Sequence, residues 1–142
     1  MKIVVSACLL GENCKYNGGN NDCPAIKEFV KGREVIAVCP EKAAGLGVPR
    51  DPIEIVDGIV RDKQGNSVQE PLRKAVEEIL AQLAGEEIDC VILKSRSPTC
   101  GVKQVYDGSF TGTLVDGMGI LAQALHEKGY RVVDSEDFIC NE

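Results

Sequence analysis

Cysteines are the residues of this sequence best suited to chemistry, and the chain has seven of them. An odd number cannot be used up in disulfide pairs. The apolar run between Lys2 and Cys8 is too short for an export signal, which needs roughly 7–15 apolar residues. The sequence therefore predicts a cytoplasmic protein, and in a reducing compartment clustered thiols indicate metal binding or catalysis.

Three of the cysteines follow segments that are expected to be strands. Cys8 comes just after the apolar run 3–5, Cys39 just after the run 34–38, and Cys100 in the loop after the run 89–93. In a parallel sheet the carboxyl ends of all strands meet at one edge, which is where open α/β sheets bind their ligands. If the three strands are close neighbours, these cysteines converge on one site.

Hydrophobic periodicity predicts the strands and helices that position these three cysteines. Buried strands are expected at 3–5, 34–38, 89–93 and 130–133, and a hairpin at 53–60, turning at Asp57-Gly58. Helices are expected to start at the capping residues Asp22, Ser67 and Asp116. Alternating strands and helices predict an α/β protein with a three-layer Rossmann-like fold and a mostly parallel sheet of about four or five strands. No repeat or linker divides the chain, so a single domain spanning 1–142 is expected.

The spacing of the cysteines does not decide which metal or cluster they bind. Zinc takes four protein ligands in structural sites, or three and a water in catalytic ones, but the sole histidine, His126, lies on the last expected helix. A 4Fe-4S cluster usually has four cysteine ligands, so three would leave one iron open to substrate. An iron–sulfur cluster, zinc and a set of buried thiols all remain possible. Cys14 is the next candidate ligand, whereas Cys90 and Cys140 are expected to be ordinary thiols.

Composition narrows the class of partner. The formal charge of −6 argues against a nucleic-acid backbone as ligand, and no apolar run approaches the roughly 18 residues of a membrane span. Aromatic residues make up only 4 % of the chain, which argues against stacking as the main binding device. A small-molecule substrate fits these properties best.

Five ordered motifs resemble a bacterial family long described as a domain of unknown function, which includes the thiouracil desulfidases. The motifs are SACLLG at 6–11, KYNGG at 15–19, CPE at 39–41, GLGVPR at 45–50 and KSRSPTCG at 94–101. The resemblance runs from Val4 to about Glu136, in a single-domain form that lacks the extra domain of longer relatives. It implies that Cys8, Cys39 and Cys100 bind a 4Fe-4S cluster.

The same resemblance implies catalytic roles for Glu41 and Ser97. Without the resemblance, Glu41 is interpreted as a solvated charge at a helix start, and Ser97 as part of a turn. Arg50 and Arg96 are either substrate contacts or solvated side chains.

The expected reaction is non-redox hydrolytic C–S cleavage of a thiolated pyrimidine such as 2-thiouracil, or of a related thiocarbonyl. A soft sulfur would bind the open iron, water would attack the adjacent carbon, and sulfur would leave as hydrosulfide. Glu41 would act as general base or proton shuttle, and Ser97 would orient substrate or relay a proton. The alternative is a binding or sensing module in which a metal or cluster organises the loops without turnover.

Overall fold

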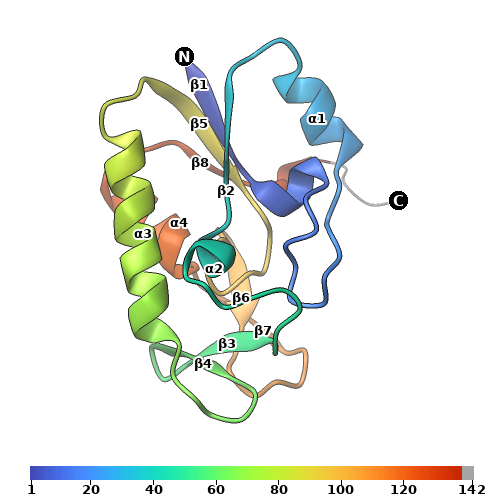
Figure 1. The fold of residues 1–142 in the computed structure, drawn as a ribbon, viewed down its shortest axis with the longest axis vertical. Coiled ribbons are helices and arrows are strands. Elements are labelled where there is room, and N and C mark those ends of the chain that lie inside the picture. Colours follow the sequence, from blue (N-terminus) through green and yellow to red (C-terminus); the bar gives the residue numbers. More distant parts are fainter. Residues whose placement is uncertain (139–142) are drawn as a thin grey trace.

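A four-stranded parallel sheet forms the centre of the molecule in the computed structural model, which describes residues 1–138 (Figure 1). Its strands are β1 (Lys2–Ser6), β2 (Val35–Val38), β5 (Ile88–Leu93) and β8 (Val132–Asp134). They lie in the order β2-β1-β5-β8, and every neighbouring pair is parallel. The predicted α/β class and parallel sheet are therefore confirmed.

Helices cover both faces of the sheet. The first face packs on α1 (Pro24–Val30), and the second on α3 (Gln69–Leu83) and α4 (Ile120–Glu127). Successive side chains of a strand point to opposite faces, so in β1 Ile3 and Val5 pack on the α1 side and Val4 on the other. This arrangement gives the three layers that the sequence predicts.

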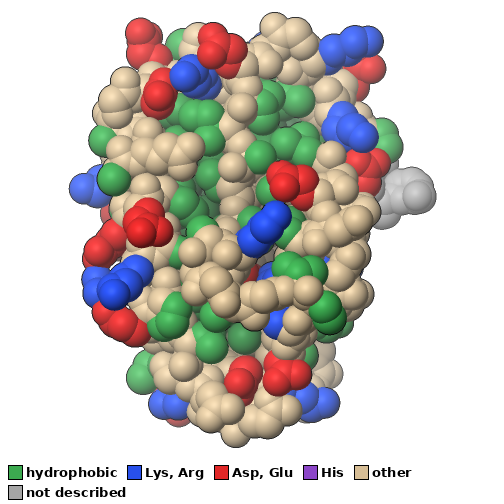
Figure 2. Space-filling view, in the orientation of Figure 1, with side chains coloured by type: hydrophobic (Ala, Val, Ile, Leu, Met, Phe, Trp, Pro, Cys, Tyr) green, Lys and Arg blue, Asp and Glu red, His purple; other side chains and the backbone are tan. Residues whose placement is uncertain are grey.

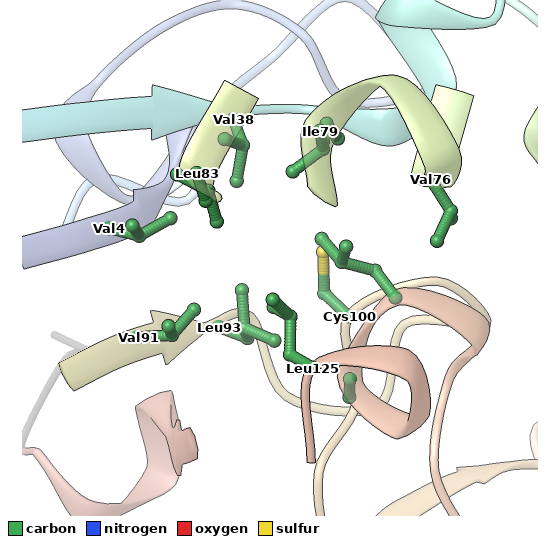
Figure 3. Packing of buried hydrophobic residues seen from close by; sticks show 11 residues of the cluster. Val4, Val38, Val76, Ile79, Leu83, Val91, Leu93, Cys100 and Leu125 are labelled. Atoms are coloured by element: carbon green, nitrogen blue, oxygen red, sulfur yellow. The ribbon is translucent and has the colours of Figure 1, made fainter. Parts of the chain in front are cut away.

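The core on the α3 and α4 side extends to the carboxyl edge of the sheet. It joins Val4, Val91 and Leu93 of the strands to side chains of both helices, and Cys100 belongs to the same cluster (Figure 3). Cys100, one of the three cysteines that follow strands, is therefore packed in the hydrophobic core.

Two antiparallel hairpins lie beyond the carboxyl edge of the sheet (Figure 1). The first joins β3 (Ile53–Val56) to β4 (Ile59–Asp62) and turns at Asp57-Gly58, as predicted. The second joins β6 (Gln104–Tyr106) to β7 (Leu114–Asp116). It follows the loop after the predicted strand 89–93, where no strand is predicted from the sequence. Strands of three residues are too short to give a periodic hydrophobic signal.

The predicted helix starts were wrong in detail. The residue that precedes α1 is Cys23 rather than Asp22, and α3 follows Val68, although the Ser67 hydroxyl still accepts the Gln69 N–H at 3.3 Å. Asp116 lies in β7, and α4 starts after Gly119. The remaining short elements are η1 (Ala7–Leu10), α2 (Pro40–Ala43) and η2 (Ser135–Asp137).

Charged side chains are spread over the face seen in Figure 2, with acidic and basic groups interspersed around a central band of hydrophobic ones. Within residues 1–138, none of the helices has the length and apolar character needed to cross a membrane.

Candidate functional site

Three cysteines from three strand ends line one cavity. Cys8 lies in η1, directly after β1, Cys39 follows β2, and Cys100 lies in the loop after β5. Since β1 lies between β2 and β5, these strand ends are neighbours, at the point where the strand order reverses. The cavity has a volume of about 550 Å³, which is ordinary for a small-ligand site. We call these three residues the cysteine triad.

Polar groups face two of the three triad sulfurs, those of Cys8 and Cys100. The Asn21 side-chain amide donates to Cys8 Sγ at 3.3 Å, and the Thr99 hydroxyl lies 3.6 Å from Cys100 Sγ. Burial raises the pKa of Cys8 and raises the pKa of Cys100 to about 12, while these hydrogen bonds act in the opposite direction. A metal that binds here must displace the thiol protons, and the donors that already face the sulfurs then stabilise the thiolates.

Glu41 is buried beside the triad in an ion pair with Arg50. Its Oε1 accepts from Arg50 Nη2 at 2.8 Å and from Arg50 Nε at 3.2 Å. The two side chains are only 15 % and 7 % exposed, so neither is a solvated surface charge. Arg50 also donates to the carbonyls of Gly47 and Cys14, at 2.8 and 2.9 Å. Arg50 therefore fixes the carboxylate and the loop that carries Cys14, a role that the sequence did not indicate.

A chain of hydroxyl groups connects Glu41 to Ser97. The other carboxylate oxygen, Oε2, accepts from the Thr99 hydroxyl at 3.2 Å, and Thr99 Oγ1 lies 2.9 Å from Ser97 Oγ. Because a hydroxyl has a single hydrogen, a Thr99 hydroxyl that donates to Glu41 must accept from Ser97. Ser97 Oγ in turn accepts the N–H groups of Thr99 and Cys100, at 3.1 and 3.0 Å. The chain offers a proton path from Ser97 to the Glu41 carboxylate.

Sequence reasoning did not find Thr99, although it lies between Ser97 and Cys100. The residue is 1 % exposed, and by type it reads as an ordinary buried threonine. Its part in the site follows from the tertiary structure, which places Glu41, in α2, beside its hydroxyl.

The start of α4 holds the loop that carries Ser97 and Cys100. The Ile120 N–H donates to the Pro98 carbonyl at 3.0 Å, and the Leu121 N–H to the Thr99 carbonyl at 2.8 Å. Carbonyls of the loop thus take the place of a capping side chain and satisfy the first N–H groups of the helix. The loop lies so close to the start of α4 that position 119 requires a glycine, because an added Cβ would lie 2.4 Å from the Thr99 carbonyl carbon.

The other cysteines and the histidine have different surroundings. Cys14 is buried and lines the same cavity, and its pKa is raised to about 12 by burial and by the neighbouring Cys39. Cys23 and Cys90 are buried in the core on the α1 side, away from the cavity lining. His126 is exposed in the last turn of α4. Cys140 lies outside the described residues.

A second cavity of about 550 Å³ shares Arg50 and Ile53 with the first, but its lining has no cysteine. The first cavity is the better site because it contains the triad, Glu41 and Ser97 together.

The donors at the triad are cysteine thiols. Within residues 1–138 no three His, Cys, Asp or Glu side chains are arranged tightly enough to hold one metal ion. An iron–sulfur cluster binds its cysteines through different iron atoms, so its ligands lie further apart than those of one zinc ion. Four cysteines, the triad and Cys14, line the cavity without a histidine, and soft thiolate donors of this kind suit an iron–sulfur cluster.

Fold and site together define a class: a three-layer α/β protein with a cysteine-lined cavity at the carboxyl edge of its sheet. The chain belongs to the 2-thiouracil desulfurase family, whose model matches residues 3–137. It is similar to a solved structure described as the [4Fe-4S]-dependent thiouracil desulfidase TudS, with a TM-score of 0.88 and 32 % identity, over 96 % of this chain and 91 % of that one. It is also 33 % identical to the uncharacterized protein YbbK of Bacillus subtilis (strain 168), over 95 % of this chain and 96 % of YbbK.

Proposed function

We propose that this protein is a desulfidase that removes sulfur as hydrosulfide from thiolated pyrimidines such as 2-thiouracil, or from related thiocarbonyl small molecules. The proposal depends above all on one observation: the cysteine triad shares a cavity with a hydrogen-bonded chain from Ser97 through Thr99 to Glu41. Family membership and the likeness to a [4Fe-4S]-dependent desulfidase support the same activity.

The cysteine triad would hold a [4Fe-4S] cluster. Bound by three thiolates, such a cluster supplies an iron without a protein ligand, which acts as a Lewis acid toward a soft thiocarbonyl sulfur. Hydrogen bonds from Asn21 to the Cys8 sulfur and from Ser6 to the Cys100 sulfur would stabilise the charged ligands.

Glu41 and Ser97 would move the protons of the hydrolysis. In the overall reaction the C=S bond is replaced by C=O, one water is consumed, and hydrosulfide and a proton are released, so no electron donor is needed. Ser97 would take a proton from the attacking water, giving up one of its bonds to the Thr99 and Cys100 N–H groups, and pass its own proton to Thr99, which passes its own to Glu41 Oε2. Arg50 would hold Glu41 Oε1, so that Oε2 keeps facing the hydroxyl chain.

Purification without oxygen tests the proposal. The protein should contain about four irons and four acid-labile sulfides per chain. With 2-thiouracil it should release uracil and hydrosulfide in equal amounts without added reductant. Zinc as the only metal after reconstitution would reject the cluster, and a requirement for stoichiometric reductant would reject the hydrolysis.

A Glu41→Gln variant separates catalysis from binding. Gln is close in size and its amide oxygen can still accept from Arg50, although the charge that pairs with Arg50 is lost. The cluster spectrum should therefore be retained while the rate falls by about 10²–10⁴-fold. Affinity for 2-thiouracil, measured on protein with matched iron content, should change much less. Full activity in this variant would remove the general-base role. Binding of several thiopyrimidines without any turnover in the unmodified protein would indicate a sensing module instead.

A further inference from the structure

The few aromatic residues of this chain are concentrated at the cavity. The sequence contains three tyrosines, three phenylalanines and no tryptophan. Three of these six, Tyr16, Tyr106 and Phe110, line the cavity that contains the cysteine triad. The low aromatic content therefore says nothing against stacking, because half of the aromatic side chains lie where a ligand would bind.

Phe110 is held in place from β3. It lies in the loop of the β6–β7 hairpin, and its N–H donates to Glu54 Oε1 at 3.1 Å. The same oxygen accepts the Gly108 N–H at 2.9 Å. Glu54 is 8 % exposed, so its carboxylate binds the hairpin loop and is shielded from solvent. An added Cβ at Gly108 would lie 2.6 Å from the Ile55 carbonyl oxygen, which shows how closely the loop packs on β3.

Neither the backbone nor the core explains a phenyl ring at position 110. The φ angle of Phe110 is +59°, a region that bulky residues rarely occupy and that glycine or asparagine would fit with less strain. The side chain is half-buried and belongs to none of the hydrophobic core clusters among the described residues. A strained residue whose ring borders a cavity and lies outside the core is typical of a ligand contact.

We propose that Phe110, together with Tyr106, forms an aromatic wall against which the ring of a flat heterocyclic substrate stacks. The inference rests on the proposed desulfidase function and narrows its substrate class to planar ring thiocarbonyls, such as thiopyrimidines. The triad side of the cavity takes the sulfur atom, and the hairpin side takes the face of the ring. Aromatic side chains stack on nucleobase-like rings irrespective of their substituents, so this wall selects for ring shape.

Replacing Phe110 by glycine is the sharpest test, because glycine removes the ring and suits the positive φ angle. Binding is measured by calorimetry on anaerobically purified protein with matched iron content. The ligands are 2-thiouracil, uracil (the same ring without sulfur) and thiourea (the same C=S group without the ring). Phe110→Gly should weaken the binding of both ring compounds by about 5- to 150-fold and leave thiourea binding within about 2-fold.

Two further variants serve as controls. Phe110→Tyr keeps a stacking face and should bind like the unmodified protein. Val115→Ala changes an exposed side chain on β7 of the same hairpin, outside the cavity lining, and should have no effect. Unchanged ring binding in Phe110→Gly, or an equal loss for thiourea, would overturn the aromatic wall.

The test also separates this inference from the proposed function. Uracil has no thiocarbonyl sulfur, so its binding does not depend on desulfurisation. Ring binding that needs Phe110 without any hydrosulfide release would retain the wall and reject the desulfidase. Normal hydrosulfide release, with ring binding that does not depend on Phe110, would retain the desulfidase and reject the aromatic wall.

Discussion

Removing Arg50 should destabilise the protein more than any single surface charge does. An Arg50→Met change keeps a long apolar side chain but leaves the Glu41 carboxylate, 15 % exposed, without its cation. It also removes the charged donors of the Gly47 and Cys14 carbonyls. Breaking a buried ion pair by removing one partner typically costs about 3–5 kcal/mol, so the unfolding free energy should fall by about that much. For a chain of this size the melting temperature should fall by about 10 °C or more.

The measurement is urea unfolding followed by circular dichroism, on samples with matched iron content, because loss of a bound cofactor also changes stability. A double-mutant cycle with Glu41→Gln isolates the pair. The double variant should be more stable than the sum of the single changes predicts, by about 1–3 kcal/mol, since it leaves no uncompensated buried charge.

Arg73→Met is the matched control. Arg73 pairs with Glu70 and Glu77 on the exposed face of α3, and exposed pairs contribute little, so the unfolding free energy should stay close to that of the unmodified protein. A cost of less than about 1 kcal/mol for Arg50→Met, or additive effects in the cycle, would refute the view that Arg50 neutralises Glu41 in a buried site.

Three further predictions concern the site. Serine at any position of the cysteine triad should deplete iron, sulfide and visible absorbance, whereas Cys90→Ser should leave all three unchanged; cluster retention in a triad variant would contradict the ligand assignment. Thr99→Val should lower hydrosulfide release on the order of 10²-fold, with activity restored in Thr99→Ser, because only the hydroxyl connects Ser97 to Glu41; equal activity in both variants would exclude the relay. Gly119→Ala should lower iron content and melting temperature, since its Cβ would overlap the Thr99 carbonyl carbon, while Gly85→Ala, with no atom within 4 Å of an added Cβ, is the control.

Local patterns predicted most of the central fold. Continuous apolar runs identified the four parallel strands to within one or two residues, because strands buried on both faces leave an unbroken hydrophobic signal. Helix starts were predicted less well, since α4 is capped by the carbonyls of Pro98 and Thr99 and needs no capping side chain. The β6–β7 hairpin and α2 are too short to show a period.

The sequence by itself determined which residues could do chemistry and on which strand ends they lie. Cys8, Cys39 and Cys100 follow three strands, and that fact alone predicts a common edge once the sheet is parallel. Only the tertiary structure decided that β1 lies between β2 and β5, that Arg50 is buried against Glu41, and that Thr99 bridges Ser97 to Glu41. The strand order and the bond from Thr99 to Glu41 join segments that are distant in the chain, and the Arg50–Glu41 pair depends on how deeply both side chains are buried. These relations depend on strand order and on the burial of charge, which no local spacing encodes.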